Sequence, residues 1–134
     1  GIARWLAAGH AAALVSGRDS PALRRRADEL GIRHVAAGVR DKREAVALMC
    51  EALGRPASAC AYVGDDLPDL VAIEEVGLPL AVVDAAGEVK EAAEGATHSL
   101  GGHGAVREIV EVILRAQGHW DLGGAGLRNQ RMEG

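Results

Sequence analysis

The sequence predicts a doubly wound α/β fold, in which helices cover both faces of a parallel sheet. Short apolar runs alternate with segments of helical periodicity along most of the chain. Capping residues, glycines and prolines separate these segments at regular intervals. The 134 residues, 49% of them apolar, amount to one globular domain. Strands that alternate with helices run parallel, and such sheets are normally buried on both faces.

Local signals place each element. Ser20-Pro21 begins a helix that Gly31 ends, and Asp41 begins another that ends before Gly54. In chain order we expect helices at 2–9, 20–30, 41–53, 66–76, 88–94 and 104–117, and strands at 11–16, 33–37, 59–63, 78–83 and 96–100. We therefore predict one domain over residues 1–117, followed by a glycine-rich tail over residues 118–134.

Three carboxylates occur where the apolar run at 60–63 turns into a helix. Asp65 and Asp66 follow Gly64 directly, and Asp69 lies one helical turn beyond Asp66. Open α/β sheets bind ligands at the carboxyl ends of their strands, and a cluster of oxygen ligands suits a hard cation such as Mg²⁺. Taken alone, this pattern is equally compatible with Asp66 capping the helix and Asp65 facing solvent.

Two more segments accompany the acidic cluster. An apolar run ends in Ser16-Gly17-Arg18, and Asp41-Lys42 opens a helix. In this order the segments resemble the haloacid dehalogenase superfamily of phosphatases, and most closely its capless branch that acts on phosphorylated sugar acids. The segments 30–32 and 101–108 also look like that branch, and the resemblance extends from residue 2 to about residue 119.

The resemblance implies a role for each polar residue of the three segments. Asp65 is expected to coordinate Mg²⁺, with Asp66 acting beside it or through a water molecule. Asp69 is expected to orient Asp66. Ser16 is expected to bind a phosphoryl oxygen, and Lys42 to offset the negative charge that the nucleophile and the phosphate share.

Two substrate contacts are also implied. The backbone N–H of Gly17 is expected beside the phosphate, and Arg18 is expected to grip a sugar-acid carboxylate in two parallel bonds. A surface position is an equally good interpretation of Arg18, and the Ser-Gly pair alone is typical of an ordinary loop. The family often carries an arginine where this chain has His103, which leaves the role of that histidine open.

The nucleophile motif of the family does not occur in these 134 residues. Members begin with a strand that ends in Asp-x-Asp, and the sequence contains no such triplet. The chain starts at Gly1 inside a helical pattern without a capping residue. We therefore expect the first strand and a flap to lie upstream. The implied topology puts that strand in the middle of the sheet, between the strands that end at Ser16 and at Gly64.

Composition narrows the class of partner. The net charge of -4 and a pI near 5.7 argue against nucleic acid as a partner. No run approaches the ~18 apolar residues of a membrane span, and we expect a cytoplasmic protein. Cys50 and Cys60 do not form a CxxC pair, and we expect buried structural thiols.

The leading hypothesis is a Mg²⁺-dependent phosphomonoesterase with an aspartyl nucleophile outside this segment and a substrate similar to 3-deoxy-octulosonate 8-phosphate. The branch implies a homotetramer. The alternative is a non-catalytic assembly domain of the same fold, like that of some sialic acid cytidylyltransferases. A phosphoacceptor signalling domain is a third hypothesis. Retention of Ser16, Lys42 and Asp65 favours the enzyme, because an assembly module does not need this polar set.

Overall fold

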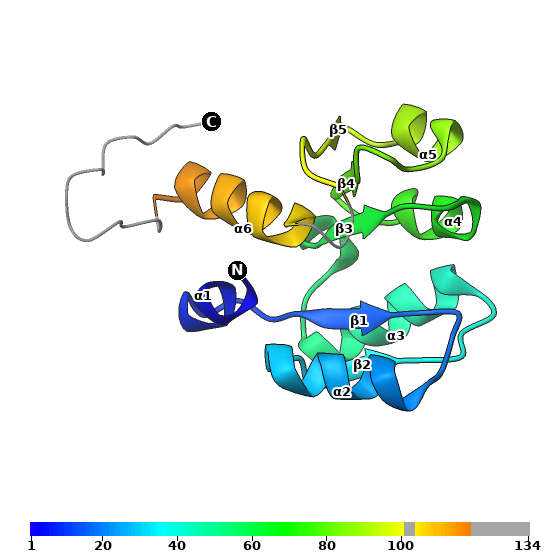
Figure 1. The fold of residues 1–134 in the computed structure, drawn as a ribbon, viewed down its shortest axis with the longest axis horizontal. Helices are drawn as coiled ribbons and strands as arrows, with labels where there is room; N and C mark the ends of the chain where they lie inside the picture. The colour runs from blue at the N-terminus through cyan, green and yellow to red at the C-terminus, as the bar shows by residue number, and fades with distance from the viewer. Residues whose placement is uncertain (101–103, 119–134) are drawn as a thin grey trace.

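The computed structural model describes residues 1–100 and 104–118 (Figure 1). Its helices are α1 (Ile2–Ala7), α2 (Pro21–Leu30), α3 (Lys42–Leu53), α4 (Leu70–Ile73), α5 (Gly87–Ala92) and α6 (Ala105–Ala116), with 3₁₀ helices η1 (Ala57–Ala59) and η2 (Leu67–Asp69). Its strands are β1 (Ala13–Val15), β2 (His34–Ala36), β3 (Ala61–Gly64), β4 (Leu78–Ala81) and β5 (Gly95–Ala96).

Strands and helices alternate, and every strand pair is parallel. The predicted α/β class is confirmed. The predicted tail lies outside the described residues except for Gly118, as does His103.

The helix ends follow the capping residues that the sequence indicates. The Ser20 and Asp41 side chains each accept hydrogen bonds from backbone N–H groups in the first turn of α2 and of α3. Gly31 and Gly54 end these helices with φ values of 79° and 70°. Glycine adopts this left-handed conformation without a steric penalty. Local sequence therefore fixes where α2 and α3 begin and end.

The strands form two separate parallel sheets, and the break falls between β1 and β3, where the implied topology puts the family's first strand. β1 pairs with β2, and β3 pairs with β4, which pairs with β5. Figure 1 shows β1 and β3 running in the same direction. Within the described residues no backbone hydrogen bond joins them. Each sheet thus has an unpaired edge at β1 or at β3.

Helices hold the two sheets together. α1 contacts α6, and α3, which packs on β1 and β2, also contacts α4. Arg43 of α3 makes ion pairs with Glu74 at 3.2 Å and with Glu75 at 3.3 Å, just after α4. The relative placement of β1 and β3 is therefore set by helix packing and not by strand pairing.

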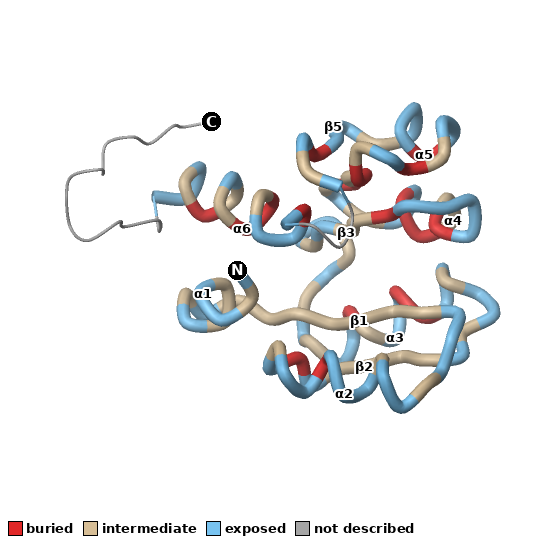
Figure 2. Tube along the Cα trace, in the orientation of Figure 1, coloured by how far each residue is buried: buried red, intermediate tan, exposed pale blue. Residues whose placement is uncertain are grey.

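The buried core lies mostly around the second sheet. Ile73, Leu114 and Val89 are the largest fully buried side chains, and they belong to α4, α6 and α5. In contrast, all residues of β1 and β2 are only half-buried, as the tan colour in Figure 2 shows. Strands of a parallel sheet are normally buried on both faces. Incomplete burial of β1 is consistent with its unpaired edge.

Most elements are shorter than predicted, and two of the differences have an identifiable structural cause. The helix expected at 66–76 is divided into η2 and the single turn α4, which ends at Ile73. The helix cannot continue through Gly77, because the backbone N–H of Gly77 bonds the Ala57 carbonyl at 3.0 Å and a Cβ at position 77 would overlap the Ser58 carbonyl oxygen. This close approach starts the pairing of β4 with β3.

The strand expected at 96–100 ends at Ala96. The hydroxyl of Thr97 accepts a hydrogen bond from the Val83 N–H at 3.2 Å and donates one to the Ser99 carbonyl at 2.6 Å. A side chain thus occupies the backbone groups that a longer strand would have paired. Among the described residues, none of the helices combines the length and the apolar character that crossing a membrane requires.

Candidate active site

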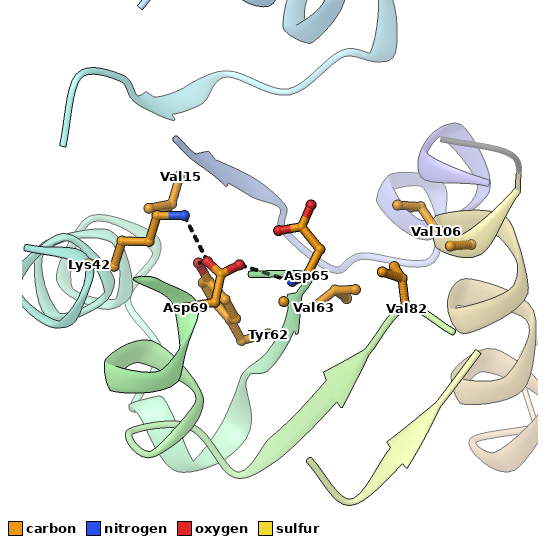
Figure 3. A pocket seen from close by; sticks show the side chains of 10 residues that line it. Val15, Lys42, Tyr62, Val63, Asp65, Asp69, Val82 and Val106 are labelled. Carbon is orange, nitrogen blue, oxygen red and sulfur yellow. Dashed lines mark hydrogen bonds and ion pairs between the residues drawn. The ribbon is translucent and has the colours of Figure 1, made fainter. Parts of the chain in front are cut away.

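A cavity of about 290 Å³ opens between β1 and β3, at the carboxyl end of β3 (Figure 3). Its wall combines side chains from both sheets and from the first turn of α3. The residues that matter for its chemistry are Val15, Lys42, Tyr62, Val63, Asp65 and Asp69. A carboxyl end of a strand is where the sequence predicts ligand binding.

Asp69 organises the polar side of this cavity. Its side chain is only 4% exposed. One oxygen, Oδ1, accepts hydrogen bonds from Lys42 Nζ at 2.7 Å and from the Tyr62 hydroxyl at 2.6 Å. The other, Oδ2, accepts from the backbone N–H groups of Asp65 at 2.9 Å and of Asp66 at 3.2 Å. Four donors therefore satisfy one buried carboxylate, so Asp69 holds protein groups in place.

These bonds fix the segment that carries the other two carboxylates. Because both backbone N–H groups are bound by Asp69, this carboxylate restrains the turn after β3. Figure 3 shows the Asp69 carboxylate between the Lys42 ammonium and the Asp65 side chain. The side chain of Lys42 is 15% exposed and reaches Asp69 from the start of α3. The predicted lysine and acidic cluster are thus brought together, with Asp69 as the connection.

Charge and burial shift the ionisation of three of these groups. Burial opposes ionisation of Asp69, but hydrogen bonds from Lys42, Tyr62 and the two amides outweigh it and hold the pKa of this carboxyl well below its usual range. Burial raises the pKa of Tyr62, and its bond to the Asp69 carboxylate raises it further. Partial burial of the Asp65 carboxyl, followed by the neighbouring Asp69, raises the pKa of Asp65, although the residue as a whole is exposed.

Gly64 allows Asp69 to approach the end of β3. A Cβ at position 64 would lie 2.9 Å from the Cβ of Asp69 and 3.0 Å from Cδ1 of Ile73. Cβ atoms essentially never make contacts shorter than 3.0 Å, so the buried Gly64 leaves the space that the Asp69 side chain needs. The glycine before the acidic cluster therefore has a packing role that its motif position alone does not reveal.

Asp66 makes the capping interaction that the sequence left open. Its Oδ1 accepts a hydrogen bond from the Leu67 N–H at 2.8 Å, and Asp69 bonds the backbone of Asp66 in return. The two residues form a capping box at the start of η2. The orienting role predicted for Asp69 corresponds to the bond from the Asp66 N–H.

The turn after β1 carries the other three predicted residues. Ser16 Oγ accepts a hydrogen bond from the Arg18 N–H at 3.0 Å, and Arg18 is exposed. At Gly17 an added Cβ would only make ordinary contact with the Val39 carbonyl, at 3.6 Å. In the described structure, Val15 lines the cavity and these three residues do not. The structure therefore brings Lys42, Asp65 and Asp69 together, whereas Ser16, Gly17 and Arg18 lie beyond the cavity wall.

Tyr62 is a site residue that the sequence did not single out. It is the only tyrosine in a chain without phenylalanine, and it lies within β3. The available signal was its position two residues before Gly64, because alternate residues of a strand point to the same face. An isolated tyrosine in an apolar strand is usually a core residue, so this signal was weak.

The acidic pair is the part of the site that could hold a metal. Asp65 and Asp66 offer carboxylate oxygens, the ligand type that Mg²⁺ prefers. The Asp65 carboxyl lies in the cavity wall, and the described structure shows no hydrogen bond to it from a basic side chain. Within residues 1–100 and 104–118, no three histidine, cysteine, aspartate or glutamate side chains are grouped closely enough to hold an ion. The pair fits part of a magnesium site, and other oxygen ligands would have to complete it.

The chain matches a known family over more than half of its length. Residues 2–77 match the haloacid dehalogenase-like hydrolases. The chain belongs to this family. The resemblance inferred from the three polar segments is therefore confirmed, as is the family's α/β fold.

Curated relatives carry the same name in several bacteria. The chain is 43% identical over 106 residues to the 3-deoxy-D-manno-octulosonate 8-phosphate phosphatase of Haemophilus influenzae, in an alignment that covers 79% of the chain and 59% of the relative. It is 39% identical over 109 residues to that of Escherichia coli K12, over 81% of the chain and 58% of the relative. The chain thus spans somewhat less than two thirds of the length of these relatives.

Solved structures of such phosphatases have the same fold. The cobalt-bound form of the enzyme from Haemophilus influenzae superposes with a TM-score of 0.85 at 41% identity, and the alignment covers 87% of this chain and 68% of the other. The enzyme from Moraxella catarrhalis, in complex with magnesium, phosphate and the sugar acid, superposes with a TM-score of 0.82 at 39% identity, over 85% and 66% of the two chains.

Proposed function

We propose that this chain forms the larger part of a Mg²⁺-dependent phosphomonoesterase that hydrolyses 3-deoxy-D-manno-octulosonate 8-phosphate or a closely similar sugar-acid phosphate. One observation carries the proposal: Lys42 and Asp65 lie on the wall of one cavity and are both held by the buried Asp69. The relatives that are about 40% identical bear the name of this phosphatase. One of them was solved with magnesium, phosphate and the sugar acid bound.

The acidic and basic residues of the cavity are suited to different roles. Asp65, with Asp66 beside it, would hold Mg²⁺, which neutralises phosphate oxygens when bound. Lys42 has only one of its three N–H donors directed at Asp69 in the described contacts. Its remaining donors and its positive charge are suited to stabilise the negative charge of a phosphoryl group. Asp69 links the ammonium to the Asp65 backbone, since each of its two oxygens accepts a hydrogen bond from one of them.

The separation of the two sheets supports a proposal for where the nucleophile lies. We propose that residues outside the 134 supply a strand that pairs with both β1 and β3. Both edges are unpaired, both strands run in the same direction, and the cavity takes its lining from each. A parallel strand in this position would end beside Asp65, where an aspartate could attack a phosphorus atom near the metal. Residues 1–117 would then be the phosphatase domain without its first strand and flap.

The substrate contacts predicted for Ser16, Gly17 and Arg18 belong to the same proposal. These residues follow β1, so they would lie at the same edge of the completed sheet as Asp65. A homotetramer, which the resemblance implies, and a cytoplasmic location, which was expected from the composition of the sequence, are also part of the proposal. Light scattering of the purified protein tests the tetramer.

The alternative is a non-catalytic assembly domain, in which the cavity has no catalytic role. The Lys42–Asp69 ion pair is buried, and the cost of desolvating such a pair offsets much of its attraction. A gain in stability is therefore a weak explanation for its presence. The experiment that separates the two hypotheses is hydrolysis of the sugar-acid phosphate by the whole protein, with and without Mg²⁺. We expect hydrolysis that stops in excess chelator, returns with Mg²⁺, and is absent from the Asp65→Asn variant. Hydrolysis that persists in chelator would overturn the metal assignment, and no hydrolysis under any condition would favour assembly.

A further inference from the structure

Two thiols meet at the opposite end of β3 from the cavity. Cys50 lies on α3 and is buried, and Cys60 lies just before β3 and is partly exposed. Their sulfur atoms are 3.6 Å apart. They are the only cysteines of the chain. Their spacing in the sequence gave no sign of this contact, because a helix end and a turn separate them.

The backbone between the two residues is fixed. The Arg55 N–H bonds the Cys50 carbonyl at 3.0 Å, and the Cys60 N–H bonds the Ala57 carbonyl at 3.0 Å. Around the thiols, Val46 and Ala72 complete a buried apolar cluster. The two sulfur atoms are thus brought together by a well-defined turn and a packed core, and not by two mobile side chains that meet by chance.

We propose that Cys50 and Cys60 are a thiol modification site, which a small disulfide converts into an intramolecular Cys50–Cys60 disulfide. The sulfur atoms must approach from 3.6 Å to the bonded distance of about 2.05 Å. This requires a shift of about 1.5 Å, which side-chain rotation and a small adjustment of the turn can provide. The bond would join α3 to the start of β3.

The surroundings of the thiols set the order of the steps. Cys60 is the accessible one, and it reacts first: its thiol loses a proton to solvent and attacks the small disulfide, releasing one small thiol. The Cys50 thiol then loses its proton and attacks the Cys60 sulfur of the mixed disulfide, releasing the second small thiol. Two protein thiols are oxidised and one small disulfide is reduced to two thiols, so atoms and electrons balance.

Cys50 is a poor first nucleophile for a physical reason. Burial, then the hydrogen bond and the charge of Cys60, raise the pKa of the Cys50 thiol to about 11. Once Cys60 is in a mixed disulfide, it no longer carries a negative charge against which Cys50 must ionise. The first step therefore favours the second.

The cross-link would lie away from the cavity. Cys60 precedes β3, whereas Asp65 follows it, and Cys50 lies two turns along α3 from Lys42. Oxidation should therefore stabilise the fold without changing the arrangement of Lys42 and Asp69. A short loop that is closed by a disulfide restricts the unfolded chain.

The test uses 5,5′-dithiobis(2-nitrobenzoate), whose released thiolate is coloured. All equivalents are counted relative to the Cys50→Ala, Cys60→Ala double variant, so that thiols outside residues 1–134 do not contribute. On this scale we expect the native protein to release two equivalents and these two residues to retain no aromatic adduct. The second release should be first-order and independent of reagent concentration, because it is intramolecular. Glutamyl endopeptidase, which cuts after Glu44, Glu51 and Glu74, should then leave peptides 45–51 and 52–74 joined until reduction. The melting temperature should rise by about 5 °C or more on oxidation.

Single variants provide the controls. Cys50→Ala should release one equivalent and keep the adduct on Cys60. Cys60→Ala should react at least about tenfold more slowly than the native protein does in its first step, because only the buried thiol is left. A native protein that keeps one adduct, or that forms disulfide-linked dimers in place of the internal bond, would overturn the proposal. Because this result comes from the unaltered protein, it stands even if a variant fails to fold.

Discussion

Lys42 and Asp69 form a buried ion pair, with 2.7 Å between Nζ and Oδ1, that joins the start of α3 to the segment after β3. α3 follows the strands of the first sheet, whereas Asp69 follows the first strand of the second. The pair therefore connects the two sheets at the edge of the cavity. Removing either partner would leave the other charge buried without a counterion, which is among the more destabilising changes a protein can undergo.

Asp69→Asn should destabilise the protein by about 3–5 kcal/mol, since it leaves Lys42 unpaired and gives Tyr62 and two amides a poorer acceptor. Urea unfolding measures the change. The matched control is Glu29→Gln, the same acid-to-amide change in the exposed pair with Arg26, which should cost less than about 1 kcal/mol. Equal losses in the two variants would show that Asp69 is not the organising group.

Lys42→Ala should lower kcat of the whole enzyme by about 10², as loss of one charge-stabilising donor often does. The resemblance predicts that this lysine offsets negative charge during phosphoryl transfer. The ion pair adds a second effect, a loss of stability, so kcat has to be measured on the folded fraction. Lys90→Ala is the control, because Lys90 is the only other lysine and its Nζ bonds the Val83 carbonyl at the surface. If kcat of the Lys42→Ala variant falls only a few-fold, the role of Lys42 is structural and not catalytic.

Tyr62 should ionise only at a pH well above that of a free phenol. Because its folded pKa is raised, its contribution to stability is complete below the unfolded pKa of about 10 and is lost as the pH rises through the folded value. The stability difference between the native protein and Tyr62→Phe should therefore shrink above pH ~10. Tyr62 is the only tyrosine of residues 1–134, and the difference in tyrosinate absorbance between the native protein and Tyr62→Phe follows this one residue. Ionisation near pH 10 in the folded protein would contradict the bond to Asp69.

Gly64→Ala should displace Asp69, because the new Cβ would lie 2.9 Å from the Asp69 Cβ. Overpacking of this kind typically costs about 1–3 kcal/mol. The tyrosinate absorbance should then appear at a lower pH than in the native protein, as the Tyr62 bond lengthens. Gly87→Ala is a control, because nothing lies within 4 Å of a Cβ there. Identical tyrosinate titrations in the two variants would show that Gly64 does not set the position of Asp69.

The sequence predicts the positions of the helix caps and of the acidic cluster because these depend on neighbours in the chain. Ser20, Asp41, Gly31 and Gly54 act over one helical turn, and the structure places each where expected. The resemblance adds the connection between Lys42 and Asp65, which local patterns could not supply.

What the sequence missed depends on contacts between distant residues. Tyr62 approaches Asp69 only because β3 and η2 fold back on each other, and Cys50 meets Cys60 only because of the intervening turn. The short strand β5 has a similar origin, since the Thr97 hydroxyl occupies the Val83 N–H across a separation of 14 residues. Periodicity carries no information on such side-chain bonds.

The unpaired edges of β1 and β3 lead to the last prediction, which concerns residues 1–134 expressed alone. A central strand buries four or five apolar side chains, each worth ~1.5–3 kcal/mol, so its absence costs on the order of 6–15 kcal/mol. This equals the roughly 5–15 kcal/mol stability of a typical domain. We therefore expect these residues alone to be inactive and to unfold without a sharp transition or to associate through the free edges.

The measurement is thermal unfolding, together with light scattering, of residues 1–134 beside a longer form that includes the family's first strand. The longer form should melt cooperatively and hydrolyse the phosphate ester. Adding the strand as a separate peptide should restore part of the cooperative transition, because β1 and β3 both offer parallel edges for it. A monomeric product of residues 1–134 that melts sharply above about 45 °C would show that helix packing alone closes the molecule and that the proposed place for the strand is wrong.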